Sequence, residues 1–370
     1  KVLGDGPRSE SRAAVPSPFG LMAALAALLL AAAATPAAAA APTHPAEVQT
    51  DAGIELTVTS AGPAVPRTCY PAGGLPAFVN GTYLVGGPAR FEIGSYSFQA
   101  IFDGFGMMNR FELSVGQVCY TSVWLNTGYL RDALQGGQPS PGLYFEDTRP
   151  QRPSCPLLDP ICNVNGPNDN NWVNIIPVGG EVLLLSDTPT MVRMDLETLN
   201  CSGRKPWADD KSEPVGPPQP DWLEGMHAGT SGSAHPLKIP GTDTWVEVIG
   251  ELPEVMGNPW IAVYTFQGSV VGPQKRKKIG GIRTGTARYT HSFGVTPNYV
   301  VLPFNLELSV SPFTSKTLLD SFQGDWKGLH VMDLRDGSVQ VFDTEPFFHV
   351  HTVNTFENAS GIVMDLGFYK

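Results

Sequence analysis

Three histidines stand at similar intervals in the second half of the chain: His235, His291 and His351, 56 and 60 residues apart. The four-stranded repeats of common β-propellers take roughly 40–50 residues each. Slightly larger repeats would place each histidine on the equivalent strand of a successive sheet. If those are the innermost strands, the three imidazoles converge and form a metal site. Coincidence among the seven histidines of the chain is the alternative, and spacing alone does not exclude it.

The last of the three lies in the stretch FFHVHTVNTFE, residues 347–357. In a β-strand, Phe347, His349 and His351 would point to one face, because side chains alternate between the two faces. An imidazole on a mostly apolar strand is either a core residue with a hydrogen-bond partner or a metal ligand. Taken alone, this stretch favours the core interpretation.

The elements that must position these histidines are strands. From about Gly53 onward, short runs rich in Val, Ile, Tyr and Phe alternate with Gly, Asn, Asp or Pro, which predicts an all-β fold: a sandwich, a barrel or a propeller. The pair Asp336-Gly337 between two alternating runs predicts a hairpin. The best helix candidates are the short segments 130–137 and 315–322.

Composition limits the classes of function. Hydrophobic residues make up 42% of the 370 residues and charged residues 16%, enough for a substantial core. The net charge of −11 argues against a nucleic-acid-binding protein. The basic run Lys275–Lys278 favours a solvated hairpin over a membrane or phosphate patch.

The five cysteines show no zinc-finger spacing. Cys155 and Cys162 share a Pro- and Asn-rich loop and would either form a disulfide in an oxidising compartment or stay free thiols. The chain has no HExxH, Walker or GxSxG motif.

Residues 1–45 have the layout of a targeting peptide. Lys1, Arg8 and Arg12 precede an uncharged Ala- and Leu-rich run, 19–42, that ends in small residues. We expect this segment to be cleaved or disordered, and a folded domain to occupy residues 50–370.

Three sequence blocks surround the histidines: GTSGSAHP at His235, RYTHSFGVTPNYVVLP at His291 and PFFHVHTVNTFE at His351. Together they resemble the carotenoid cleavage oxygenase family, whose blocks occur in this order at similar separations. The resemblance extends upstream through Phe102-Asp103-Gly104 and the segment 173–199, and covers roughly residues 75–370.

The resemblance implies a seven-bladed β-propeller with short helical caps and an Fe(II) ion bound by four histidines. Three of these ligands correspond to His235, His291 and His351. His349 is expected to pack or to support a ligand, and Asp187 matches a position where relatives carry an acidic residue that orients a ligand. No catalytic group beyond the metal centre is expected. The family supplies its fourth histidine near its C-terminus, so we expect an incomplete propeller here that lacks its last blades and this ligand.

The implied reaction is O2-dependent cleavage of a conjugated double bond in a carotenoid or apocarotenoid to two carbonyl products. The segments 95–113 and 328–342 resemble the plastid branch that acts on apocarotenals in the strigolactone pathway. One alternative is an incomplete family member or fragment that only binds an apocarotenoid. A second is a zinc hydrolase, because three imidazoles and a water molecule also form a catalytic zinc site.

The expected partners are the polyene substrate and O2, with peripheral membrane association, a monomeric state and no nucleic acid. The expected location is the plastid, with a secretory route as the alternative.

Overall fold

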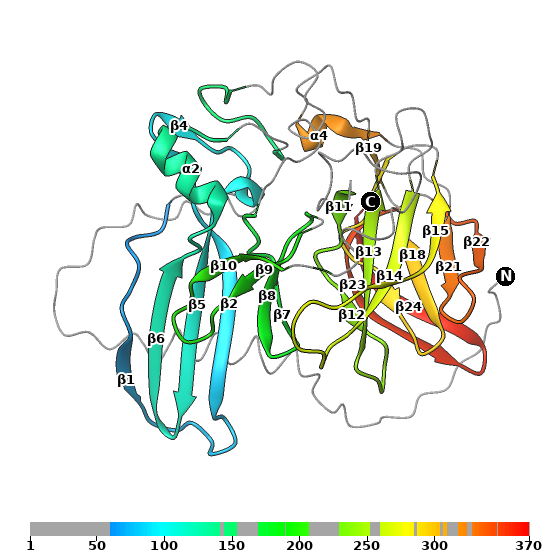
Figure 1. The fold of residues 1–370 in the computed structure, drawn as a ribbon, viewed down its shortest axis with the longest axis horizontal. Helices are drawn as coiled ribbons and strands as arrows, with labels where there is room; N and C mark the ends of the chain where they lie inside the picture. Colours follow the sequence, from blue (N-terminus) through cyan, green and yellow to red (C-terminus); the bar gives the residue numbers. More distant parts are fainter. Residues whose placement is uncertain are drawn as a thin grey trace, which may run out of the picture. The chain divides into compact units, whose positions relative to one another are not determined.

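A computed structural model describes residues 60–140, 144–153, 169–188, 190–205, 207, 229–251, 260–284, 287–303, 306–308, 317–323, 328–345 and 347–369. Most of this part is β-strand (Figure 1), which confirms the predicted all-β class. Two sequence predictions lie outside the described residues, namely the targeting peptide and the Cys155–Cys162 pair.

The first half of the described chain forms two antiparallel four-stranded sheets. The first has the strand order β1-β6-β5-β2 and the second β10-β9-β8-β7. Their bounds are β1 Thr68–Ala72, β2 Gly81–Arg90, β5 Phe105–Ser114, β6 Gly116–Trp124, β7 Asn174–Val178, β8 Glu181–Leu185, β9 Val192–Met194 and β10 Cys201–Arg204.

The third and fourth sheets repeat this pattern. The third has the order β11-β13-β14-β15, with β12 paired to β13, and the fourth β17-β18-β21-β22. Their bounds are β11 Gly229–Gly232, β12 Leu237–Lys238, β13 Thr244–Glu251, β14 Trp260–Gln267, β15 Lys277–Arg283, β17 Gly294–Val295, β18 Tyr299–Pro303, β21 Leu329–Asp333 and β22 Val339–Phe342.

A fifth sheet pairs β23 with β24, and shorter elements complete the described chain. Their bounds are β23 Phe348–Asn358, β24 Gly361–Tyr369, β3 Glu92–Ile93, β4 Tyr96–Ser97, β16 Ala287–Tyr289, β19 Leu306–Leu308, β20 Phe322–Gln323, the 3₁₀ helix η1 Ile101–Asp103, and the helices α2 Gly128–Gly136 and α4 Leu318–Ser321. Both predicted helices are therefore present. None of the helices described is long and apolar enough to cross a membrane.

The predicted hairpin at Asp336-Gly337 is also present, between β21 and β22. Gly337 has a φ of 74°, in the left-handed region that glycine adopts without strain. A Cβ atom at this position would lie 2.4 Å from the carbonyl oxygen of Ile279. The turn therefore requires glycine for both its backbone conformation and its close approach to β15.

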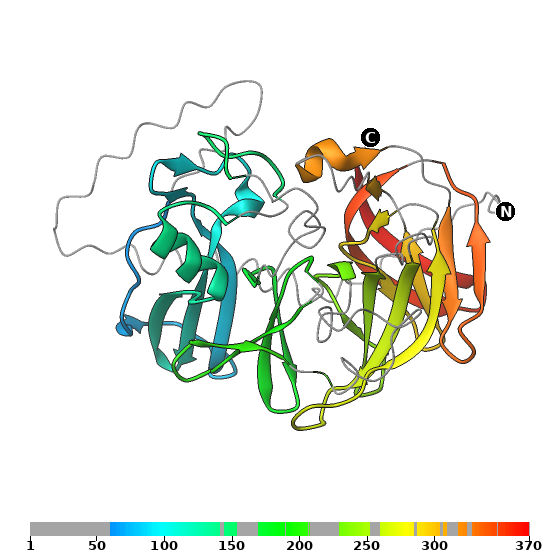
Figure 2. The same ribbon diagram turned by 45° about the horizontal axis from the view of Figure 1, so that its top comes forward.

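Figure 2 shows the strands of the third and fourth sheets as neighbouring ribbons. Apolar side chains pack consecutive sheets against one another. Met108 of the first sheet packs with Leu184 and Val192 of the second in one cluster. Two further clusters join the second sheet to the third and the third sheet to the fourth. The core is therefore a series of layers, each between two successive sheets.

The basic run that the sequence predicts to be a solvated hairpin joins β14 to β15. Lys275 and Lys277 are exposed, but Arg276 is only 2% exposed, so the prediction is wrong for this residue. The Arg276 guanidinium lies 3.3 Å from the Glu247 carboxylate and 4.8 Å from the centre of the Trp207 ring. Arg276 immediately precedes β15 and is buried between two exposed neighbours.

Asp103, from the Phe-Asp-Gly motif, holds a loop above the first sheet. Its carboxylate accepts hydrogen bonds from the backbone N–H groups of Phe145 (2.8 Å) and Glu146 (3.1 Å). The neighbouring carbonyl oxygen of Tyr144 accepts the N–H of Leu318, which places α4 against the same loop. Burial raises the pKa of Asp103 to about 7, although the two N–H donors and Arg152 lower it.

This pKa gives a testable pH dependence. The folded-state pKa lies above the ordinary value of 3.8, so between about pH 4 and 7 the folded protein binds more protons at Asp103 than the unfolded chain. The free energy of unfolding therefore falls as the pH rises through this window, by up to about 1.4 kcal/mol per pH unit from this group. We expect Asp103→Asn to remove this component, measured by urea unfolding at several pH values. Identical pH dependence in both proteins would contradict the assignment.

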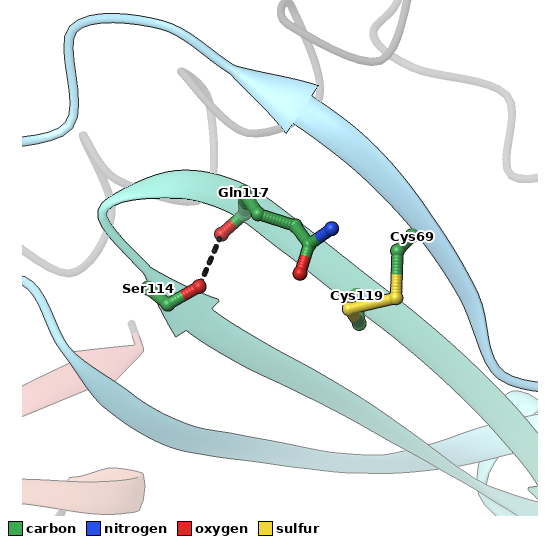
Figure 3. The surroundings of a disulfide bond; sticks show 4 residues. All are labelled: Cys69, Ser114, Gln117 and Cys119. Atoms are coloured by element: carbon green, nitrogen blue, oxygen red, sulfur yellow. Dashed lines mark hydrogen bonds between the residues drawn. A yellow bond between two sulfur atoms is a disulfide. The ribbon is translucent and has the colours of Figure 1, made fainter.

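A disulfide that the sequence did not single out joins Cys69 of β1 to Cys119 of β6 (Figure 3). It lies in a small compact unit formed by residues 68–81 and 112–119, whereas most other described residues belong to a second, larger unit. Of the described cysteines only Cys201 has a free thiol. The bond ties two strands whose cysteines are 50 residues apart in the chain.

We expect Cys119→Ser to lower the free energy of unfolding of the oxidised protein by about 2–4 kcal/mol, because the bond restricts the unfolded chain. The control Cys201→Ser removes a free thiol that packs against an apolar cluster, and its effect should not depend on a reducing agent. Chemical unfolding with and without a reducing agent measures both effects. Equal stability of Cys119→Ser and the oxidised parent chain would show that the disulfide does not form.

Candidate metal centre

The three histidines of the sequence blocks occupy corresponding places in successive sheets. His235 follows β11, His291 precedes β17 and His351 lies on β23. Each of these strands is the first in the chain of its sheet and stands at a sheet edge. This placement follows the repeat spacing that the sequence indicated.

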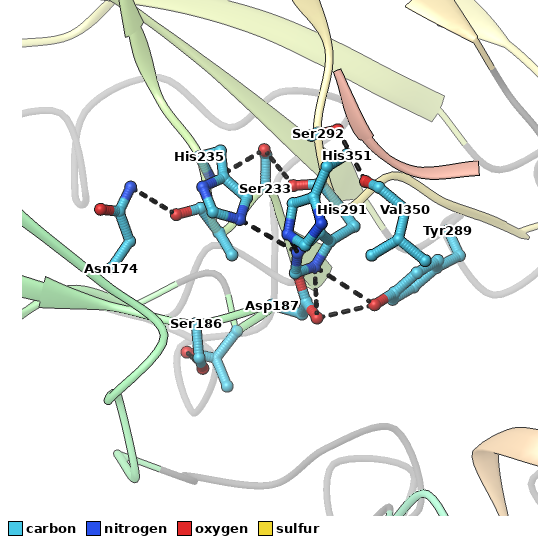
Figure 4. Close-up of polar contacts among 12 residues, drawn as sticks. Asn174, Ser186, Asp187, Ser233, His235, Tyr289, His291, Ser292, Val350 and His351 are labelled. Atoms are coloured by element: carbon cyan, nitrogen blue, oxygen red, sulfur yellow. Dashed lines mark hydrogen bonds and ion pairs between the residues drawn. The ribbon is translucent and has the colours of Figure 1, made fainter. Parts of the chain in front are cut away.

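The structure brings the three imidazoles together (Figure 4). The Nε2 atom of His291 lies 3.0 Å from Nε2 of His235 and 3.1 Å from Nε2 of His351. The three ring planes stand nearly perpendicular to one another, at 71–77°. Among the described residues, these histidines form a group whose ligand atoms all lie within 4.8 Å of one another.

The convergence fits a bound cation better than hydrogen bonding between the rings. A neutral imidazole has one lone pair, on the nitrogen without hydrogen. Both short contacts share Nε2 of His291, and one lone pair cannot accept two good hydrogen bonds along the same axis. A single cation between the rings accepts one lone pair from each of them.

The nitrogen separations also bear on the geometry of such a cation. Two nitrogen atoms about 2.1 Å from one ion are about 3.0 Å apart at a right angle and about 3.4 Å apart at the tetrahedral angle. The observed 3.0 and 3.1 Å for two of the three nitrogen pairs are compatible with nitrogen atoms that share one ion. Three imidazoles are a donor set that suits iron, and they suit zinc as well.

Asp187 orients the central histidine. Its Oδ1 and Oδ2 atoms lie 2.8 and 3.0 Å from Nδ1 of His291. A carboxylate only accepts hydrogen bonds, so Nδ1 of His291 carries the hydrogen and Nε2 is left with its lone pair. The backbone carbonyl of Asp187 also accepts the N–H of Gly232 in β11, 2.9 Å away. The residue thus contacts the segments of two of the histidines.

Tyr289 is a further member of this network that sequence reasoning missed. Its hydroxyl donates to Oδ2 of Asp187 over 2.7 Å. Burial, with added repulsion from Asp187, raises the pKa of Tyr289 well above its usual range, so the phenol keeps its hydrogen. Tyr289 is the last residue of β16 and stands two residues before His291. That spacing was the available signal.

The pKa values of the outer two histidines are lowered. Burial, with repulsion from the His291 and His351 rings, lowers the pKa of His235 to about 4, although Asp187 acts in the opposite direction. Burial, and then the His291 ring, also lowers the pKa of His351. Neutral imidazole is the form that binds a metal, so both rings are ready to act as ligands at neutral pH.

The stretch 347–357 does not follow simple alternation. His349 pairs with Phe368 and Thr352 with Leu366, so β23 contains one more residue than β24 across this interval. Such a bulge redirects side chains. The prediction that His349 and His351 share a face is therefore wrong: His349 is buried beside Phe347, and His351 is exposed at the cluster. His349 packs, as expected for this position.

The remaining histidines take no part in the described cluster. His330 lies in β21 and pairs with Leu302 of β18, in agreement with its predicted strand position. His44 and His227 lie outside the described residues.

A sequence model of the retinal pigment epithelial membrane protein family matches residues 58–370. This is the family of the carotenoid cleavage oxygenases. The chain belongs to this family. The match includes the segments of all three clustered histidines and confirms the resemblance drawn from the sequence blocks.

Curated relatives of this family are distant in sequence. The chain is 24% identical over 345 residues to carotenoid isomerooxygenase of Galleria mellonella, covering 86% of this chain and 62% of the relative. It is 27% identical over 344 residues to the chloroplastic carotenoid cleavage dioxygenase 8 homolog A of rice, covering 85% and 57%. It is 25% identical over 336 residues to the human mitochondrial carotenoid-cleaving dioxygenase, covering 80% and 52%.

Solved structures show the same fold. A tryptophan-to-alanine variant of Synechocystis apocarotenoid oxygenase superposes with a TM-score of 0.62 at 19% identity, covering 83% of this chain and 62% of that one. The cobalt-substituted form of that oxygenase gives 0.62 at 20% identity, with 84% and 62% covered. The fold is therefore the β-propeller of this family. The chain spans between half and two thirds of the length of the relatives it matches.

The contact between Asp187 and His291 leads to a test of metal affinity. We expect Asp187→Ala to weaken Co(II) binding by about 10–100-fold, because the carboxylate fixes the ligand's tautomer and ring orientation. Asp187→Asn keeps an acceptor oxygen without the charge and should lie between Asp187→Ala and the parent chain. Titration of the visible Co(II) absorption measures the dissociation constants.

The matched control for this test is Asp195→Asn, which alters an exposed aspartate hydrogen-bonded to Thr198. It should bind Co(II) like the parent chain. Unchanged affinity in Asp187→Ala would remove Asp187 from the metal centre.

Proposed function

We propose that the chain carries the metal centre of a non-haem iron dioxygenase in which His235, His291 and His351 bind Fe(II). The observation that carries this proposal is the approach of three Nε2 atoms to 3.0 and 3.1 Å in a member of the carotenoid cleavage oxygenase family. Neutral imidazoles suit Fe(II) and leave its charge uncompensated by the ligands themselves. The carboxylate of Asp187, which contacts His291, is the anionic group closest to the three imidazoles among these contacts.

The proposed reaction cleaves one conjugated double bond of a carotenoid or apocarotenoid. One molecule of O2 is consumed, and each carbon of the broken double bond receives one oxygen atom, which gives two carbonyl products. The iron, when bound, supplies the site at which O2 is activated. The protein residues hold that ion: Asp187 fixes the tautomer of His291, and burial keeps His235 uncharged.

The relatives support this substrate class by their names, which include carotenoid-cleaving dioxygenases and an apocarotenoid oxygenase. The rice relative agrees with the proposed place in the plastid, apocarotenal-cleaving branch.

The alternative is a family member that only binds an apocarotenoid and does not cleave it. The two functions differ in turnover, since both allow a polyene to bind. A protein that takes up Fe(II) and a polyene but consumes no O2 would be the binding protein.

Two properties of the partners are proposed along with the reaction. A lipid substrate favours peripheral membrane association, and three exposed apolar side chains lie on connected segments: Ile101, Phe102 and Leu319. The Phe102 ring lies 4.8 Å from that of Phe145, whose carbonyl oxygen accepts the N–H of Leu319. We also propose a monomer that binds no nucleic acid, in keeping with the net charge of −11.

The proposed location is the plastid, with the secretory route as the alternative. Relatives bear chloroplastic and mitochondrial names, and an organellar address agrees with the basic and apolar N-terminal segment. The Cys69–Cys119 disulfide favours an oxidising compartment, because reducing compartments keep cysteine thiols in the reduced form. This bond is the observation that supports the secretory alternative.

The activity is tested with the purified chain loaded anaerobically with Fe(II) and then offered O2 with β-carotene or several apocarotenals. We expect two carbonyl products by chromatography and mass spectrometry, with O2 consumed in equal molar amount. His291→Ala should abolish turnover, because it removes the ligand that both other imidazoles approach.

The control variant His330→Gln alters a histidine outside the cluster and should retain turnover. Undiminished cleavage by His291→Ala would refute the proposed metal centre. Iron uptake without cleavage in the parent chain would favour the binding protein.

A further inference from the structure

Polar side chains cross between consecutive sheets beside each histidine of the cluster (Figure 4). Asn174 of β7 donates from Nδ2 to the carbonyl oxygen of Ala234, the residue before His235, over 3.0 Å. Ser233 donates to the carbonyl oxygen of His291 over 2.8 Å. Ser292 donates to the carbonyl oxygen of Val350, the residue before His351, over 2.7 Å. Each donor belongs to the sheet that precedes its acceptor.

Both serines are fully buried and use their hydroxyl groups twice. Ser233 is 3% exposed and Ser292 2%. The Ser233 oxygen also accepts the N–H of His235 over 3.2 Å, and the Ser292 oxygen accepts the N–H of Thr352 over 2.9 Å. Each hydroxyl therefore fixes two backbone groups that flank or belong to a histidine of the cluster.

The serine bridges match the pairs of imidazoles that come closest. Ser233 connects the segment of His235 to that of His291, and Ser292 connects the segment of His291 to that of His351. The short Nε2 distances are found within the same two pairs. Each close pair of imidazoles is thus accompanied by one buried hydroxyl that ties their two backbones together.

We propose that Ser233 and Ser292 are positioning residues of the metal centre, which set the separation of its histidines by fixing the sheets that carry them. This inference rests on the proposed function, because it concerns the same metal. The hydrogen bonds described above join the two serines to backbone groups and not to the ligand nitrogen atoms. They act on the backbone groups that carry the ligands.

The physical reason lies in the difference between apolar packing and hydrogen bonding. The core between the third and fourth sheets is built from apolar side chains such as Val263, Phe293 and Leu302. Apolar contact is not directional, so it opposes separation of two sheets more strongly than a small slide. A hydrogen bond weakens steeply outside a narrow range of distance and angle. A metal site needs its ligands within about 0.5 Å of their places, which directional contacts can provide.

The experiment compares Ser233→Ala and Ser292→Ala with the parent chain, using Co(II) alone as the probe. We expect each variant to bind Co(II) about tenfold more weakly, at the lower end of the effect of residues that support ligands. We also expect the visible Co(II) spectrum to change, because the ligand field depends on the positions of the histidines. The double variant should bind more weakly than either single variant.

The matched control is Ser122→Ala. Ser122 is also 2% exposed, and its hydroxyl accepts the N–H of Val65, 57 residues away, over 2.9 Å. It belongs to β6 of the first sheet, outside the histidine cluster. We expect this variant to lower the melting temperature of the metal-free protein, as the other two do. It should keep both the parent affinity for Co(II) and the parent rise in melting temperature on Co(II) addition.

The outcomes separate this inference from the proposed function. If the parent chain binds neither Co(II) nor Fe(II), the proposed metal centre fails. If the parent chain binds Co(II) and both serine variants keep its affinity and spectrum, the metal centre stands and the positioning role is refuted. Two variants at separate sheet junctions, with melting temperatures and near-ultraviolet circular dichroism as folding checks, guard against loss of folding in one of them.

Discussion

The mutual approach of three imidazoles, each from a different sheet, is the constraint on which the rest of the site depends. Nitrogen atoms that present lone pairs to one another at 3.0 and 3.1 Å repel unless a proton or a cation lies between them. The tautomer imposed on His291 by Asp187 leaves no hydrogen on the shared nitrogen. The arrangement therefore suits a bound cation. It persists only if the three sheets keep fixed positions relative to one another.

Two kinds of contact maintain that relation. Apolar clusters between consecutive sheets supply most of the favourable free energy of burial. Side-chain hydrogen bonds from Asn174, Ser233 and Ser292 add direction at the edge where the histidines stand. The division resembles that of many metal sites, in which the hydrophobic shell controls solvent access and polar partners hold the ligands.

The histidine cluster contacts few charged groups. The chain as a whole carries a net charge of −11, yet a single carboxylate, that of Asp187, contacts the histidine cluster among the interactions found. The pKa values of His235 and His351 are lowered, and neutral imidazoles leave the charge of a bound divalent ion largely uncompensated.

The sequence by itself determined the strands, the Asp336-Gly337 hairpin, the family and the three histidines, because these depend on local alternation, turn chemistry and short blocks around each residue. Only the tertiary structure decided which groups meet across long stretches of chain: Cys69 with Cys119, Tyr289 with Asp187, and each serine with the carbonyl group of the next sheet. It also decided that Arg276 is buried and that a bulge separates His349 from His351. Strand periodicity fixes the face that a side chain occupies in a regular strand. The partner it finds there is set by how the sheets pack, which no local pattern encodes.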